Sequence, residues 1–272
     1  MVSETIELLG KNIYTDIPGK LTLKSFPTTT ELDYVGSEDF EKTMLEDIFP
    51  KCIEEQVNFS HLLEIDFQWI CRGFRFLNYG PYYTTNMILC DNCGTVRGEY
   101  QVDLRSVDCK TLPDDFTGDI VVKKDELIDY QKDVHFHLLT IQEAMDLRKD
   151  KLFFTKDGTS NTQYARLCYS ISGFGNGGKE SINALSAKLE IEKNMSPADL
   201  KVLMSVSNDL TDYGLRGGGR CACPQCHSKG AAFIALADDR FFRPTVGDLR
   251  EGRNDRNLRG MEISSGDKAE AV

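Results

Sequence analysis

Cys90-Asp91-Asn92-Cys93 is one of two Cys-x-x-Cys sequences in this chain, and Cys223-Pro224-Gln225-Cys226 is the other. A Cys-x-x-Cys turn places two sulfur atoms on one side of a tight loop, and two such turns supply the ligands of a tetrahedral zinc site. We therefore predict that Cys90, Cys93, Cys223 and Cys226 together hold one zinc ion. Because four thiolates fill the coordination shell, the predicted zinc is structural and not catalytic.

The same cysteine spacing leaves several alternatives open. A rubredoxin-like iron site uses identical turns, although the lack of an obvious redox partner motif favours zinc. Two separate sites would form if Cys109 completed the first pair and Cys221 the second, and His227 is a further reserve ligand. Thiols without any metal are the last alternative. Three other cysteines fall on apolar helical faces and are predicted core residues: Cys52, Cys71 and Cys168.

Composition limits the classes of protein that this chain can represent. Its 272 residues are 40% hydrophobic and 28% charged, which is ordinary for a globular protein with one large or two modest domains. The formal net charge of −11 opposes attraction to nucleic-acid phosphates and to anionic membranes. No apolar run approaches the ~20 residues that span a bilayer. The nine cysteines are an odd number, and the paired motifs favour a reducing compartment with bound metal.

Periodicity and capping signals predict a mixed α+β fold. Helices are expected at residues 37–50, 61–77, 164–171, 180–192 and 196–213, and one begins at the capping box of Thr140 and Glu143. Strands are expected at residues 20–24, 83–89, 98–104, 119–122, 134–138 and 231–236. We predict that these helices pack around a split, zinc-ribbon-like centre, in which flanking strands carry the two Cys-x-x-Cys knuckles.

The two halves of the chain show a weak internal repeat of helix, knuckle and strand. The predicted organisation is a segment of strand and helix at 1–57, a first repeat unit at 58–105, an inserted α/β region at 106–195 and a second unit at 196–246. The metal would clamp the base of the insertion. Residues 247–272 are polar and glycine-bearing, and are predicted to form an extended or disordered tail.

Other motifs resemble functional sites but have simpler explanations. Residues 173–178 satisfy G-x-G-x-x-G, yet they follow a predicted helix, so we expect a loop between two helices and no dinucleotide site. His135 and His137 would share one face of a strand, and without a third ligand nearby they are expected to be exposed. Phe241 and Phe242 would point to opposite sides of an extended segment, with at least one in the core. No nucleophile motif or carboxylate pair indicates an enzyme.

In its order of motifs, the chain resembles the baseplate hub proteins of T-even-type contractile-tailed bacteriophages. The resemblance covers most of residues 15–245. It is carried by the strand Ile17-Pro18-Gly19-Lys20-Leu21-Thr22-Leu23, the helix that ends in Asn78-Tyr79-Gly80, both Cys-x-x-Cys pairs, Tyr100-Gln101-Val102-Asp103-Leu104 and Phe241-Phe242-Arg243-Pro244. The chain departs from the pattern at His227, where a glycine is usual, and in its polar tail.

The resemblance implies a non-enzymatic structural or assembly protein of the tail baseplate. It implies a location in the virion after assembly in the host cytoplasm, with other baseplate and tail proteins as partners and no small-molecule substrate, membrane or nucleic acid. Whether such a protein stays in the virion or acts only in assembly does not follow from the sequence. The alternative is a zinc-ribbon regulator that binds nucleic acid through basic residues near the knuckles: Arg97, Arg105, Arg216, Arg220 and Lys229.

Overall fold

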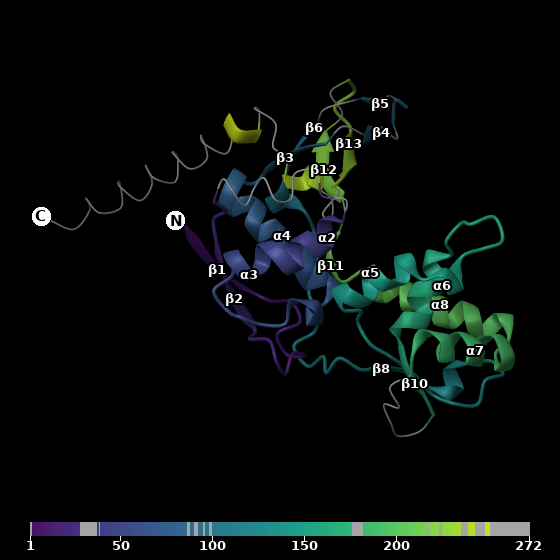
Figure 1. Ribbon diagram of the computed structural model, residues 1–272. Coiled ribbons are helices and arrows are strands. Elements are labelled where there is room, and N and C mark those ends of the chain that lie inside the picture. Colours follow the sequence, from purple (N-terminus) through teal and green to yellow (C-terminus); the bar gives the residue numbers. More distant parts are fainter. Residues whose placement is uncertain are drawn as a thin grey trace, which may run out of the picture.

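The computed structural model describes residues 2–27, 37, 39–85, 88–89, 92–94, 96–97, 100–175, 182–216, 218–222, 225–234, 239–242 and 248–250. Within these residues the fold is mixed α+β, with seven α-helices and small antiparallel sheets. Two groups of buried apolar side chains divide the structure into two lobes, which lie side by side in Figure 1. No helix among the described residues is both long and apolar enough to cross a membrane.

The first lobe is built around helix α4 (Glu64–Tyr79), whose buried face includes Phe67, Ile70 and Phe74. The hairpin of β1 and β2 packs against this helix at Gly73, where an added Cβ would lie 2.7 Å from Leu23. The other elements of this lobe are β1 (Ser3–Glu7), β2 (Lys20–Lys24), α2 (Phe40–Thr43), α3 (Phe49–Cys52), β3 (Tyr82–Thr85), β4 (Ile88–Leu89), β5 (Val96–Arg97), β6 (Tyr100–Asp103), β7 (Cys109–Lys110), β11 (Gly214–Leu215), β12 (Gly218–Ala222) and β13 (Lys229–Phe233).

The second lobe combines a three-stranded antiparallel sheet, in the order β10-β9-β8, with four helices. Its core includes Phe136 from the sheet and Leu167 and Leu203 from the helices. The elements are β8 (Ile120–Val122), β9 (Val134–Phe136), α5 (Ile141–Lys149), α6 (Thr162–Ser170), β10 (Ile171–Phe174), α7 (Ala184–Asn194) and α8 (Pro197–Thr211). The predicted repeat pairs α4 with α8, whereas α4 packs in the first lobe and α8 in the second.

A short ladder closes the base of the second lobe. Strands β7 and β11 pair antiparallel, with Leu215 opposite Cys109, and the N–H of Arg216 donates to the carbonyl of Asp108. Gly214 begins β11 with a φ of 87°, and a Cβ there would lie 2.9 Å from Ile65 of α4. Backbone hydrogen bonds therefore close the base of residues 111–213, a segment that contains most of the insertion predicted at 106–195.

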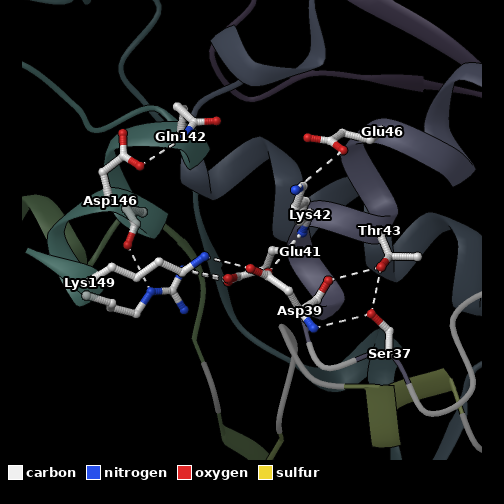
Figure 2. Close-up of polar contacts among 11 residues, drawn as sticks. Ser37, Asp39, Glu41, Lys42, Thr43, Glu46, Gln142, Asp146 and Lys149 are labelled. Atoms are coloured by element: carbon white, nitrogen blue, oxygen red, sulfur yellow. Dashed lines mark hydrogen bonds and ion pairs between the residues drawn. The ribbon is translucent and has the colours of Figure 1, made fainter.

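Charged side chains join the two lobes where α2 faces α5. Figure 2 shows Lys149 of α5 reaching Asp39, the N-cap of α2, with an Nζ–Oδ2 distance of 2.6 Å. Beside this pair, Arg148 binds Glu41 at 2.8 Å. The Lys149 hydrogen bond lowers the pKa of Asp39. A backbone hydrogen bond also joins the two lobes. The N–H of Ile141, at the start of α5, donates to the carbonyl of Leu62, which lies just before α4, at 2.7 Å.

Several sequence predictions are correct and others need revision. Thr140 caps its helix through a complete capping box with Glu143, as predicted. The helix predicted to begin at Ser196 does so, with Pro197 in its first turn, and the structure adds a second capping box between Ser196 and Asp199. The helix predicted to stop at Pro50 continues to Cys52, because Pro50 lies in the first turn of α3, where no backbone N–H is required. The G-x-G-x-x-G segment does not begin in a loop between helices. Gly173 lies in β10 opposite His135, and residues 176–178 fall outside the described residues.

Candidate metal centre

The two Cys-x-x-Cys sequences occupy the loops of two hairpins with the same layout. Strands β4 and β5 end at the pair Leu89 and Val96, which leaves loop residues 90–95. Strands β12 and β13 end at Ala222 and Lys229, which leaves residues 223–228. Both loops are six residues long and carry cysteine at their first and fourth positions. The matched loop lengths favour two equivalent knuckles.

The residue after the second cysteine of each loop has a left-handed backbone. Gly94 has a φ of 64°, and His227 has a φ of 56°. Within the described part of the chain, His227 is the sole residue other than glycine with positive φ. Such a backbone is strained for a residue with a Cβ and free of strain for glycine. His227 thus adopts the same left-handed backbone as Gly94, although it stands where a glycine is usual after the second cysteine.

We expect that His227→Gly leaves stability unchanged or raises it by up to about 1 kcal/mol, because relief of the left-handed strain offsets the larger entropy of unfolded glycine. The β-branched variant His227→Val should lose about 1–2 kcal/mol. Urea unfolding of the two variants and the wild type measures the difference. Zinc content of His227→Gly is measured in parallel, and loss of zinc from this variant would make His227 a ligand and overturn the four-cysteine assignment.

The hairpins that carry the two knuckles lie next to each other, although more than 120 residues separate them in sequence. Strand β12 runs beside β6, and β13 runs beside β4. Figure 1 shows the four strands β4, β5, β12 and β13 gathered at one end of the first lobe. The tertiary structure thus brings the two cysteine-bearing hairpins to one place, as a shared metal centre requires.

Two of the four predicted ligands lie within the described residues. Cys93 is exposed, and Cys226 is half-buried with its sulfur 2.9 Å from the Ser228 hydroxyl. Cys90 and Cys223 lie outside the described residues. Among the described residues, which do not include these two cysteines, no three His, Cys, Asp or Glu side chains are grouped as they would be around a metal ion. The shared zinc site therefore stays a prediction that the placement of the hairpins favours.

The remaining cysteines have distinct places. Cys52, Cys71 and Cys168 are buried in the two cores, which confirms their predicted packing role. Burial raises the pKa of Cys168 to about 12, so it is not a thiolate near neutral pH. Cys109, a reserve ligand, lies half-buried in β7 at the base of the second lobe, and burial also raises the pKa of its thiol. Cys221 lies in β12, opposite Gly230.

Some of the basic residues near the knuckles have acidic side chains beside them. Arg105 forms a two-pronged ion pair with Asp103, at distances down to 2.7 Å. Arg216 lies 3.9 Å from the carboxylate of Asp212. The side chains of Arg97, Arg220 and Lys229 lie outside the described residues. The two described arginines of the predicted basic patch thus each have an acidic neighbour, in direct contact for Arg105 and at 3.9 Å for Arg216.

The structure corrects three further predictions about single residues. His135 is not exposed, because its ring lies between Asp119 and the Gly175 carbonyl with 12% of the side chain accessible. His137 is half-buried and contacts Glu143. Phe241 and Phe242 belong to the 3₁₀ helix Asp239–Phe242 and are both buried in the first core, rather than pointing to opposite sides of an extended segment.

Sequence reasoning missed a buried ion pair next to the knuckle hairpins. Arg75 of α4 is fully buried and lies 3.2 Å from Asp248, which belongs to the segment predicted to form an extended or disordered tail. The same guanidinium donates to the carbonyls of Tyr82 at 2.6 Å and Phe241 at 2.9 Å. Asp248 accepts a further bond from the Thr84 hydroxyl at 2.6 Å. The polar composition of the tail gives no signal for this contact, because the partner is 173 positions away.

Asp199 is a second buried carboxylate with a structural role. It accepts hydrogen bonds from the N–H groups of Ile128 and Tyr130 and from the Ser196 hydroxyl, so it binds the loop after β8 to the start of α8. Burial alone would raise the pKa of Asp199, but the hydrogen bonds from Ile128, Ser196 and Asp129 hold it below its usual value. The carboxylate is therefore charged at neutral pH.

We expect Asp199→Asn to lower the free energy of unfolding by about 2 kcal/mol at pH 7, since the amide nitrogen that replaces one carboxylate oxygen cannot accept the hydrogen bonds that this oxygen receives. The native pKa lies below the unfolded value of about 3.9, so the contribution is present above that pH and is lost as the pH falls through the native pKa. Urea unfolding from pH 7 to pH 3 measures this difference. Asp209→Asn, at an exposed site on the same helix, is the control, and a pH-independent difference would contradict the assignment.

The fold and the hairpins define a mixed α+β protein with two matched cysteine knuckles and a candidate structural metal centre. No family model matches the sequence, and neither the curated proteins nor the solved structures include a significant match. The resemblance to baseplate hub proteins therefore stays a prediction from the sequence.

Proposed function

We propose that this protein is a non-enzymatic structural or assembly component of a contractile phage tail baseplate, in its hub region. A zinc ion held by Cys90, Cys93, Cys223 and Cys226 would fix the two knuckle hairpins to one another. The observation that supports the metal centre is the placement, side by side, of two hairpins whose loops have the same length and the same cysteine positions. The baseplate role rests on the order of sequence motifs that resembles the hub proteins.

The chemistry of the proposed centre favours a structural role. Four thiolates leave no open position at the zinc for water or a substrate, so the metal would supply cross-linking alone. One of the two hairpins is small, since β4 and β5 form two residue pairs, whereas β12 and β13 form five. A sheet of this size has little stability of its own, and a metal is one of the usual means of fixing it.

Metal analysis of protein purified without added metal tests the centre. We expect one zinc per chain and no thiolate-to-iron absorption in the visible range. Two zinc ions per chain would require separate sites, and iron would make the centre rubredoxin-like. A chain without bound metal, and with all nine thiols reactive after unfolding, would reject the metal centre altogether.

Fractionation of phage particles tests the biological role separately. We expect the protein to sediment with purified tails or with baseplate assembly intermediates, and an antibody distinguishes these fractions. Presence in intermediates alone would make it an assembly factor, and absence from both would reject the baseplate role. Salt-dependent binding to DNA in the same preparation would instead favour the zinc-ribbon regulator.

A further inference from the structure

Strand β1 has an edge that pairs with no other strand among the described residues, and it lies at the outer side of the first lobe in Figure 1. Just after β1, the N–H of Leu8 donates to the carbonyl of Gly19, so Leu8 belongs to a hydrogen-bonded pair of the ladder with β2. Such pairs alternate along an antiparallel strand, which turns the N–H and C=O groups of Ser3 and Thr5 away from β2. Within the described part of the chain these groups make no hydrogen bond, and both residues are exposed. The edge therefore presents main-chain donors and acceptors with which another strand can pair.

Trp69 of α4 marks one end of this free edge. Its indole N–H donates to the carbonyl of Glu7 at 3.1 Å, and Glu7 is the next residue of β1 whose carbonyl points away from β2. The bond agrees with the direction that the ladder assigns to the odd-numbered residues. The free part of the edge thus extends from Ser3 to Thr5.

A cavity of about 490 Å³ lies beside this edge. Side chains from β1, from α4 and from the segment that begins at β7 line it, and those of α4 include Trp69, Arg72 and Phe76. The even-numbered residues of β1, Glu4 and Ile6, also line it. Since side chains alternate between the two faces of a sheet, a strand added to β1 would place every second side chain over this cavity.

Arg72 supplies a positive charge on the α4 side of the cavity. Its guanidinium carbon lies 4.7 Å from the ring centre of Trp69 and 4.4 Å from that of Phe76, and its Nε donates to the carbonyl of Leu104 at 3.4 Å. No carboxylate among the described residues is within ion-pair distance of Arg72, and nearby Asp103 pairs with another arginine. Burial lowers the pKa of Arg72, so the half-buried cation lacks the partner that would offset its desolvation.

The acidic residues that line the cavity do not supply this partner. Glu7 pairs with Lys11 at 3.4 Å, whereas Glu4 and Asp114 are exposed residues whose charge is screened by water. The two Nη groups of Arg72 make no hydrogen bond to the described residues. A carboxylate that enters the cavity can therefore accept two hydrogen bonds from one guanidinium. Charge complementarity favours an occupant with an acidic side chain.

We propose that β1 binds an extended segment of a partner protein as an added antiparallel strand, with an acidic side chain of that segment bound to Arg72 in the cavity. The free edge argues for an extended backbone, because a strand offers donors and acceptors at the matching spacing. Partner residues opposite Ser3 and Thr5 would make these bonds and direct their side chains to solvent. The residues between them would cover Trp69 and Phe76, and the acidic one would reach Arg72.

In naming a partner protein, this inference rests on the assembly role proposed above, but it uses a different surface from the metal centre. Zinc analysis and tail fractionation test the earlier proposals without any peptide. Loss of peptide binding in a protein that holds zinc and sediments with tails would reject this inference alone. Peptide binding by a protein that is absent from tails would reject the baseplate role and leave the strand site in place.

The test uses the full chain and a short, end-blocked peptide in which threonine alternates with valine and the central valine is replaced by glutamate. Trp69 is the sole tryptophan of the chain and lines the cavity, so its fluorescence reports binding at this place, while calorimetry gives the affinity. N-methylation of the threonine amides, which would face β1, should weaken binding at least about tenfold. N-methylation of the valine amides, which would face away from β1, should leave binding unchanged. Glutamine in place of the glutamate should weaken binding at least about tenfold.

Variants of the protein test the edge and the cavity separately. Thr5→Pro removes an N–H that faces away from β2, so the hairpin should still form while peptide binding falls at least about tenfold. Thr5→Val keeps the backbone N–H and should bind as the wild type does. Arg72→Met should weaken binding of the glutamate peptide at least about tenfold and should no longer distinguish it from the glutamine peptide. Arg216→Met, at an exposed arginine that does not line the cavity, is the matched control and should leave both affinities unchanged.

Several results would overturn the proposal. Equal binding of the two N-methylated peptides would exclude strand addition. Equal binding of the glutamate and glutamine peptides to the wild type would exclude the role of Arg72. Equally tight binding of N-acetylglutamate amide would make the cavity a site for small carboxylates. A dimer of the free protein that Thr5→Pro dissociates would make a second copy of this chain the occupant of the edge.

Discussion

Replacing Cys226 by serine is expected to remove the metal and to destabilise the first lobe by about 4 kcal/mol or more. A ligand present at a thousandfold excess over its dissociation constant stabilises the folded state by about 4.1 kcal/mol, and structural zinc contributes roughly 10–16 kcal/mol in small peptides. The value here falls below the peptide range because a large apolar core also stabilises this lobe. Cys93→Ser should behave in the same way, since each variant leaves three thiolates.

Zinc content and urea unfolding of the same variants measure this effect. Cys109→Ser is the matched control, because Cys109 is half-buried in β7 and is not a ligand in the shared site. It should retain one zinc per chain. If Cys109→Ser lost zinc while Cys226→Ser kept it, the ligand assignment would be wrong. A chelator should reproduce the loss in the wild type and leave the Cys226→Ser protein unchanged.

The second large effect is expected at the buried ion pair. Arg75→Met should lower the free energy of unfolding by about 3–5 kcal/mol, because it leaves the Asp248 carboxylate buried without its cation. The carbonyls of Tyr82 and Phe241 also lose their donor. Chemical unfolding of Arg75→Met, Asp248→Leu and the double variant gives the coupling energy. The double variant should lose clearly less than the sum of the two single losses.

Two C-terminally shortened chains test whether Asp248 itself, and not the residues after it, provides this stability. A chain that ends at Arg250 keeps Asp248 and should be as stable as the full chain. A chain that ends at Gly247 lacks the carboxylate and should lose about as much as Asp248→Leu, in the range of about 3–5 kcal/mol. Equal stability of the two shortened chains would show that the pair contributes nothing to folding. The contrast separates Asp248 from the polar residues that follow it.

Sequence reasoning succeeded where the physical cause is local. The predicted capping box of Thr140 and Glu143 depends on side chains three positions apart, and it is present. Burial of Cys52 and Cys168 follows from the apolar face of a helix. The knuckle sequences likewise predict tight turns, and His227 adopts the left-handed backbone that such a turn requires. Each of these features depends on residues that are only a few positions apart in sequence.

The buried ion pair could not be predicted because its two residues are 173 positions apart in sequence. His135 and His137 were expected to be exposed, but the packing of β9 between β8 and β10 partly buries both. Asp248 falls in the segment predicted to be an extended or disordered tail, because a polar sequence gives no sign of a buried partner.

The sequence by itself determined the α+β class, the helix caps and the two cysteine turns, because these depend on short-range hydrogen bonds and periodicity. The tertiary structure alone decided that the two cysteine hairpins lie side by side and that β7 and β11 close the insertion. It alone decided that Arg75 meets Asp248. These contacts join segments more than 100 residues apart, and burial of the two apolar cores sets which segments meet.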